Sequence, residues 1–291
     1  MICQVSRFGG QPVTHRMACE FRWTCNVSTI VMITLFSQVH GIAAQPSGEN
    51  TSPSSPTATS DSASPVRVLI LTGDQHPAHD WRKTTQALQE VLSTDKRFTV
   101  RVLEHPELLA REIGHVDVII LNYSPSSKPV PGEEMRSALQ RMVGNGNGLV
   151  LIHYANGPFK DWPEYHGKIS RRNWVNDQSG HDPYQKFEVV IRDTSHPVSQ
   201  GLSSYRTTDE LYYRQVGKEP IHVLAVGHSV VTSQEEPLAF VYQYRQGRVF
   251  QTLLGHDAAS IRNTGTAELI RRGTAWSANR TPVVANTPER E

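Results

Sequence analysis

The chain has 291 residues, of which 37% are hydrophobic and 20% are charged, and its formal net charge at pH 7 is +1. Nucleic acid is not expected as a partner, because phosphate binding needs a clustered basic face and the sequence has no block of like charge. The three cysteines, Cys3, Cys19 and Cys25, all lie near the N-terminus. If that region is removed, the remaining protein has no disulfide, no thiolate metal ligand and no cysteine nucleophile.

The N-terminal region has the pattern of a secretory signal peptide. An uncharged apolar run at 27–39 follows Arg16 and Arg22 and precedes the small residues 41–45. The run is shorter than the roughly 20 residues of a transmembrane helix. A basic flank, a short apolar core and a small-residue cleavage site together predict export to the periplasm or the extracellular space. A buried N-terminal helix is the alternative interpretation.

Composition divides the rest of the chain into three parts. Residues 45–65 are almost all Ser, Thr, Pro and Ala, and cannot bury enough apolar area to offset their ordering entropy. We therefore expect a signal peptide and leader at 1–44, a disordered linker at 45–65, one folded domain at 66–277 and a flexible tail at 278–291. No stable membrane span is expected after signal cleavage, and no pattern predicts the oligomeric state.

Strand and helix patterns alternate through the first half of the expected domain. The strand patterns, apolar or alternating, lie at 66–71, 98–103, 116–121 and 148–153. The helical patterns lie at 81–92, at 106–113 as a short piece, and at 131–142 before a Gly-Asn-Gly stop. This alternation predicts an α/β fold with a doubly wound, mostly parallel sheet flanked by helices.

The second half of the expected domain is less regular. Residues 159–184 show no hydrophobic period, which is typical of a long functional loop. Further strands are expected at 187–191, 221–226, 238–244 and 248–253, and the last two should form an antiparallel hairpin. A helix at 265–276 should close the domain.

Histidines gather at the predicted ends of strands, where open α/β sheets bind their ligands. Neutral imidazoles combined with carboxylates suit a divalent metal such as zinc, or acid–base chemistry near neutral pH. Burial as ordinary core histidines, helix capping and surface exposure are the alternatives. The predicted catalytic residues are His153, His256 and Glu210. The candidate metal ligands are His76, His79, His153 and His256.

Polar and aromatic residues near the same edge are candidate contacts for a substrate. Aromatic rings can stack on the face of a sugar, although in a long loop they can equally pack that loop onto the sheet. A carboxylate such as Asp257 can orient a neighbouring histidine or cap a helix. The predicted substrate-binding residues are Asp74, Asn122, Tyr154, Trp162, His181, Tyr212 and Asp257.

Six segments, taken in order, resemble the ThuA-like (trehalose utilisation) family. They are 69–81 (LILTGDQH followed by HDW), 148–153 (GLVLIH), 196–202 (HPVSQGL), 209–212 (DELY), 247–250 (GRVF) and 254–257 (LGHD). The resemblance implies a class I glutamine amidotransferase-like, flavodoxin-like fold and a sugar or keto-sugar ligand. In that fold the strand at 148–152 leads into a nucleophile elbow that carries cysteine in the amidotransferases. This chain has His153 there, so cysteine-dependent glutaminase chemistry is not expected.

The favoured hypothesis is therefore an exported, carbohydrate-active enzyme with a histidine and carboxylate site, in one version containing a divalent metal. Its expected partner is a small carbohydrate. A secreted sugar-binding module without catalysis is the first alternative. A scaffold protein that has lost its site is the second, and it predicts histidines scattered through the structure.

Overall fold

The computed structural model of the protein describes residues 64–126 and 129–283. The predicted signal peptide and nearly all of the predicted linker lie outside the described residues, as does the end of the predicted tail. Within the described ranges, no helix is long and apolar enough to cross a membrane.

One half of the central sheet is parallel. It contains β1 (Val66–Leu71), β2 (Phe98–Leu103), β3 (Val118–Leu121), β4 (Gly148–Ile152) and β11 (Gly247–Thr252), in the spatial order β2-β1-β3-β4-β11. Every residue of β3 and β4 is buried, because helices cover both faces of this half, and such strands are continuously apolar. The doubly wound, mostly parallel sheet expected from the sequence is confirmed.

The other half of the sheet is antiparallel and larger than the predicted hairpin. From β11 the sheet continues through four strands, which are β10 (Glu235–Tyr244), β9 (His222–His228), β6 (Gln185–Ile191) and β7 (Tyr205–Asp209). Buried and exposed residues largely alternate along β6 and β7, as expected where only one face of a sheet is covered. A separate two-stranded ribbon pairs β5 (Gly180–His181) with β8 (Tyr212–Tyr213).

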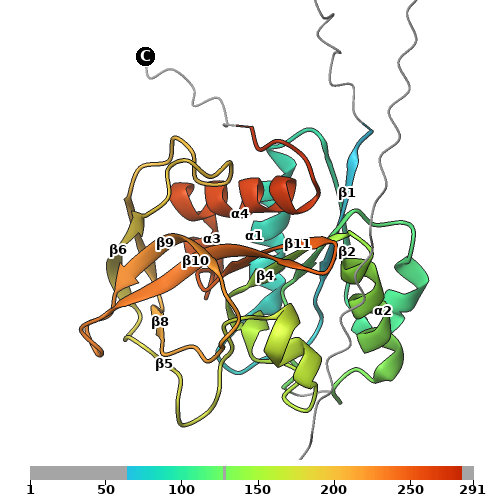
Figure 1. Ribbon diagram of the computed structural model, residues 1–291, viewed down its shortest axis with the longest axis horizontal. Helices are drawn as coiled ribbons and strands as arrows, with labels where there is room; N and C mark the ends of the chain where they lie inside the picture. The colour runs from blue at the N-terminus through green and yellow to red at the C-terminus, as the bar shows by residue number, and fades with distance from the viewer. Residues whose placement is uncertain (1–63, 127–128, 284–291) are drawn as a thin grey trace, which may run out of the picture. The chain divides into compact units, whose positions relative to one another are not determined.

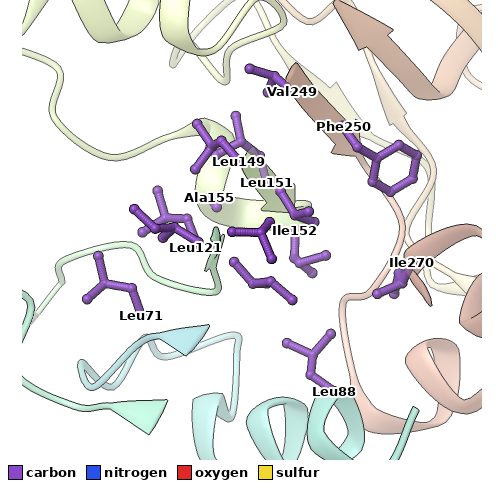
Figure 2. Close-up of a cluster of buried hydrophobic side chains, with 14 of the residues drawn as sticks. Leu71, Leu88, Leu121, Leu149, Leu151, Ile152, Ala155, Val249, Phe250 and Ile270 are labelled. Atoms are coloured by element: carbon purple, nitrogen blue, oxygen red, sulfur yellow. The ribbon is translucent and has the colours of Figure 1, made fainter. Parts of the chain in front are cut away.

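The helices cover the two faces of the sheet (Figure 1). On one face α1 (Trp81–Ser93), α3 (Ala258–Arg262) and α4 (Thr264–Ser277) contact one another. On the other face α2 (Glu133–Gly144) packs against the 3₁₀ segment η1 (Pro106–Glu112). Figure 2 shows Leu88 of α1 and Ile270 of α4 in one buried cluster with Ile152 of β4 and Phe250 of β11.

The region expected to be an irregular loop contains buried structure of its own. A π-helical turn, η3 (Tyr165–Ile169), interrupts it, and the side chains of Phe159, Trp162 and Tyr165 are buried against each other. Their ring centroids are 5.0 to 5.7 Å apart. Phe159, Trp162 and Tyr165 therefore pack into the protein, which is one of the two roles that the sequence analysis gave to aromatic residues in this loop.

Two backbone features shape the edge where the parallel strands end. Gly73, just after β1, has a φ of +120°, and a Cβ there would lie 1.9 Å from the carbonyl oxygen of Glu104. β4 ends one residue earlier than predicted, because His153 has a φ of +44° and leaves the extended conformation. His153 instead begins the 3₁₀ turn η2 (His153–Asn156).

Candidate functional site

Four chain segments meet at the carboxyl edge of the sheet. His79 lies in the turn after β1, His153 follows β4, His256 follows β11, and Glu210 follows β7. The parallel arrangement of β1, β4 and β11 brings their three histidines to one edge. Glu210 is brought to the same place by Asp209, whose carboxylate accepts a hydrogen bond from the backbone N–H of Gly255 at 2.8 Å.

His153 is held in one orientation at the centre of this group. Its side chain is fully buried, and its Nδ1 lies 2.7 Å from the carbonyl oxygen of Leu253. A carbonyl can only accept, so Nδ1 donates the proton of this hydrogen bond. Nε2 has no hydrogen-bond partner among the described residues. The positive φ at the end of a buried strand is the strained turn of a nucleophile elbow, occupied here by a histidine.

Glu210 connects the histidines of the site. Its Oε2 lies 3.1 Å from Nδ1 of His256 and 3.6 Å from Nε2 of His153, and its Oε1 lies 3.6 Å from Nδ1 of His181. Burial by itself would raise the pKa of this carboxyl, but the neighbouring His153 and His256 outweigh burial and lower the pKa. Glu210 is therefore ionised at neutral pH. No lysine or arginine forms an ion pair with it in the part of the chain that the structure describes.

His79 and His256 complete a group of three histidines. One ring nitrogen from each of His79, His153 and His256 lies within 4.8 Å of the other two. Burial, followed by the nearby histidines, lowers the pKa of His79 to about 2, so this ring is neutral and keeps a lone pair. For His256 burial acts to lower the pKa, but Glu210 outweighs it and the pKa is raised.

A pocket of about 350 Å³ opens beside this group, within the usual size range of small-molecule sites. Three aromatic residues, Tyr154, Trp174 and Tyr212, form part of its wall. The ring of Tyr154 stacks on His79 at 4.4 Å, and the ring of Tyr212 lies 4.2 Å from that of His153. The polar residues that line the pocket include His76, His79, His181, Glu210, Asn156 and Lys160.

Some of the predicted catalytic and metal-binding residues line the pocket, and the others lie deeper in the protein. Glu210 and His79 line the pocket, whereas His153 and His256 are not among its lining residues and lie behind Glu210. His76 also lines the pocket, but its Nδ1 accepts a hydrogen bond from the backbone N–H of Ala78 and it is outside the group of three. These assignments of role stay predictions.

Three of the predicted substrate-binding residues, Tyr154, His181 and Tyr212, line the pocket, and four do not. The Asn122 amide donates to Thr84 and Thr85 of α1, and Trp162 packs on Phe159 and Tyr165. Asp74 accepts a hydrogen bond from the backbone of Ser126, which does line the pocket. Asp257 caps α3 and accepts a hydrogen bond from the hydroxyl of Tyr184. These positions favour structural roles for the four residues.

Asn156 is a pocket residue that the sequence reasoning did not select. The side-chain amide of Gln215 donates to the carbonyl of Tyr213, so the Gln215 side-chain oxygen faces Asn156. The Asn156 amide nitrogen donates to that oxygen at 2.6 Å, and this leaves Oδ1 without a hydrogen-bond partner among the described residues. The sequence feature that could have identified Asn156 as a site residue is its position three residues after His153, close to the end of β4. For Lys160 and Asn176, also in the pocket wall, no sequence pattern pointed to the site.

The comparisons with known proteins agree with this architecture. The family model for ThuA, described as trehalose utilisation, matches residues 67–277, so the chain belongs to the ThuA family. No curated protein matches the chain.

Solved structures share the fold. A ThuA-like protein from Parabacteroides merdae ATCC 43184 is 26% identical with a TM-score of 0.66, and the match covers 77% of this chain and 94% of that one. A ThuA-like protein from Bacteroides uniformis ATCC 8492 is 17% identical with a TM-score of 0.59, covering 79% and 99%. The cytoplasmic protein STM1381 from Salmonella typhimurium LT2 is 14% identical with a TM-score of 0.50, covering 73% and 99%. The last two likenesses concern the fold alone.

Proposed function

We propose that the protein is an exported enzyme that acts on a sugar or keto-sugar in this pocket, with Glu210 as the carboxylate that faces the ligand. A divalent ion such as zinc would be held by His79, His153 and His256. The observation that carries the proposal is the convergence of these three histidines and Glu210 from four separate segments, beside a pocket that His79 and Glu210 line.

The donor set is suitable for zinc. Because Nδ1 of His153 donates to Leu253, Nε2 is the ring nitrogen that a metal would bind, and it has no hydrogen-bond partner among the described residues. The neutral imidazole is the form that binds metal. Tetrahedral zinc with Zn–N bonds of about 2.1 Å requires nitrogens about 3.4 Å apart. The three nitrogens lie within 4.8 Å of one another, so His79 and His256 would have to move towards the fixed ring of His153 to reach that spacing.

The charge balance at the base of the pocket also favours a cation. Glu210 is ionised, whereas burial raises the pKa of the neighbouring Asp209 carboxyl. In the described ranges no lysine or arginine forms an ion pair with either carboxylate. Buried anions are costly unless a positive charge compensates them, and a divalent ion would supply that charge.

The pocket suits a carbohydrate in shape and chemistry. The rings of Tyr154, Trp174 and Tyr212 offer faces for a sugar ring, and the polar residues between them offer hydrogen-bond partners for hydroxyl groups. A bound divalent ion would polarise a carbonyl or acidify a hydroxyl group. Glu210, ionised and in the pocket wall, is placed to accept the released proton. The description of the family as trehalose utilisation supports the same ligand class.

Export is proposed from the N-terminal sequence. The apolar run at 27–39 and the small residues after it lie outside the described residues. N-terminal sequencing of the protein recovered from fractionated cells tests this part of the proposal. Cleavage within or just after residues 41–45 is expected, and an uncleaved chain confined to the cytoplasm would contradict it.

Metal content is the direct test of the proposed centre. The purified full-length protein should contain about one zinc or other divalent ion, and His153→Asn should lose most of it, because His153 supplies a fixed lone pair. The matched control is His228→Asn, which changes an exposed histidine at the end of β9 and should keep the metal. Removal of the metal should abolish turnover of the sugar. Full turnover by the metal-free protein would exclude the metal from the mechanism.

The aromatic wall of the pocket also favours the alternative of a sugar-binding module without catalysis. That alternative expects trehalose or a keto-sugar to bind both the wild type and His153→Ala, with turnover by neither. Turnover by the wild type alone would eliminate it. The scaffold alternative expected scattered histidines, but His79, His153 and His256 lie together.

A further inference from the structure

The buried carboxylate of Asp209 forms hydrogen bonds with the segments that carry Glu210 and His256. It is the last residue of β7, directly precedes Glu210 in the chain, and its exposed fraction is 0%. No lysine or arginine is paired with it in the described ranges. A buried carboxylate of this kind needs a structural or functional reason, because burying an anion without a cation is unfavourable.

Four donors surround the two oxygens of Asp209. Oδ1 accepts from the backbone N–H of Glu210 at 2.8 Å and from that of His256 at 3.2 Å. Oδ2 accepts from the backbone N–H of Gly255 at 2.8 Å and from the hydroxyl of Ser260. The carboxylate thus bonds directly to the backbone of both members of the Glu210–His256 pair, although the two residues come from distant segments.

The loop that carries His256 depends on this carboxylate for its conformation. Gly255 has a φ of +110°, a region that L side chains rarely adopt, and its N–H is directed at Asp209. The next N–H, that of His256, is directed at the other oxygen of the same carboxylate. Rotation of the Asp209 side chain would therefore break the bonds to both residues together.

We infer that Asp209 is a positioning residue that fixes the separation between the Glu210 carboxylate and the His256 ring. The role of the Glu210–His256 pair in binding a metal or sugar rests on the proposed function. The positioning of that pair by Asp209 does not, because the hydrogen bonds of Asp209 do not involve a ligand. Asp209 is not in the pocket wall, and it acts on the ligand through Glu210 and His256.

Asp182 provides a matched control. It is also a buried aspartate, 1% exposed, and it accepts bonds from the hydroxyl of Ser229 and the backbone N–H groups of Val230 and Val231. Its bonds hold the turn between β9 and β10, not the Glu210–His256 pair. Asp182→Asn therefore reproduces the chemical change of Asp209→Asn at a site with similar burial.

The first experiment measures the pKa of His256 by NMR in the metal-free full-length protein. Asp209→Asn should lower this pKa by about one pH unit, because the variant removes a nearby charge and also releases Glu210 from its position. In a protein that already carries Glu210→Gln, Asp209→Asn should lower the His256 pKa by less than half as much. Only the loss of the Asp209 charge then acts on His256, because residue 210 no longer has a carboxylate to misplace. Asp182→Asn should leave the His256 pKa unchanged. Equal shifts in the two backgrounds would overturn the inference.

The second experiment measures zinc affinity. Asp209→Asn should weaken zinc binding by about 10- to 100-fold, as changes that misorient metal ligands commonly do, and Asp182→Asn should change it less than about twofold. If the wild type binds no zinc while the NMR difference is present, the metal proposal fails and the positioning role stands. If the wild type binds zinc and Asp209→Asn binds it equally well, the positioning role fails.

A milder variant covers the case in which Asp209→Asn does not fold. Ser260→Ala removes a single donor to Oδ2 and leaves the three backbone bonds in place. It should weaken zinc binding by about threefold and lower the His256 pKa slightly. Wild-type values for both quantities in a folded Ser260→Ala protein would contradict the inference.

Discussion

His153 combines burial, backbone strain and a ring nitrogen, Nε2, that has no hydrogen-bond partner among the described residues. Its φ of +44° is uncommon for a residue other than glycine, and such strain persists only where surrounding structure enforces it. The hydrogen bond from Nδ1 to the Leu253 carbonyl fixes the orientation of the ring and directs Nε2 towards Glu210. Where the resemblance to the amidotransferase fold implies a cysteine nucleophile in that fold, this chain has an imidazole instead.

The Glu210–His256 pair predicts how stability of the metal-free protein depends on pH. The pKa of Glu210 is lowered in the fold, so its contribution is present above about pH 4.5 and is lost as the pH falls through the lower folded value. The pKa of His256 is raised, so its contribution is present below about pH 6.5 and is lost as the pH rises through the higher folded value. Both contributions are complete together between about pH 4.5 and 6.5.

Glu210→Gln should therefore destabilise the metal-free protein most near pH 5.5. The expected loss there is about 1 kcal/mol, the value of a close ion pair that is partly shielded from water. Near pH 8.5 the loss should be smaller, because the contribution of His256 declines as the pH rises through its folded pKa. Urea unfolding at the two pH values measures the difference, and an equal loss at both would show that the pair does not stabilise the fold.

Asn156 is expected to accept a hydrogen bond from a hydroxyl group of the proposed sugar ligand. Its amide is oriented by Gln215, and its Oδ1 lacks a partner among the described residues, so a hydroxyl donor of the ligand should satisfy it. Asn156→Ala should weaken binding of the sugar by about tenfold, which corresponds to about 1.4 kcal/mol. One mono-deoxy analogue should show the same loss with the wild type.

Binding titrations of both proteins with the parent sugar and its mono-deoxy series test this prediction. The Asn156→Ala protein should not distinguish the critical analogue from the parent. Asn176→Ala, which changes an exposed residue of the same pocket wall, is the control and should keep the discrimination. If every analogue loses affinity equally in both proteins, Asn156 does not contact a hydroxyl group.

Among the secondary-structure elements, those whose burial leaves a pattern in the sequence were predicted correctly, and those held by tertiary contacts were not. β1, β3 and β4 were recognised because burial on both faces makes them continuously apolar, and the edge strand β2 was recognised by its alternation. β1 and β2 have the predicted bounds. The short elements η2 and η3 were not recognised, because tertiary contacts of buried residues such as His153 and Tyr165 stabilise them and no sequence period does. The site lies in these short elements and turns.

Two glycines with positive φ differ in the space that they leave for a side chain, and Gly73 lies in the turn after β1. At Gly73 a Cβ would lie 1.9 Å from the Glu104 carbonyl oxygen, whereas at Gly114, with a φ of +84°, a Cβ would have no heavy atom within 4 Å. Gly73→Ala should cost about 3 kcal/mol or more of unfolding free energy, and Gly114→Ala about 1 kcal/mol. Chemical denaturation measures both. Similar losses at the two positions would contradict the steric account.

At the scale of the whole molecule, one buried cluster joins the two halves of the sheet to the helices on its faces. A protein fragment of residues 64–283 should therefore unfold at the same temperature as the full chain, within about 2 °C, because it retains this entire core. Calorimetry of both proteins is the measurement. A midpoint more than about 5 °C lower, which corresponds to a loss of roughly 1–2 kcal/mol for a domain of this size, would show that residues outside this range contribute to the core.

The sequence by itself determined the α/β class, most of the strand positions and the concentration of histidines at strand ends, because burial periodicity and strand direction are local properties of the chain. It also determined that 66–277 contains no cysteine, and hence no thiolate chemistry. The tertiary structure decided which histidines meet, that Glu210 lies between His153 and His256, and that Asn122 and Trp162 do not line the pocket. These outcomes depend on side-chain direction and on contacts between distant segments, such as those of Asp209, which no local pattern encodes.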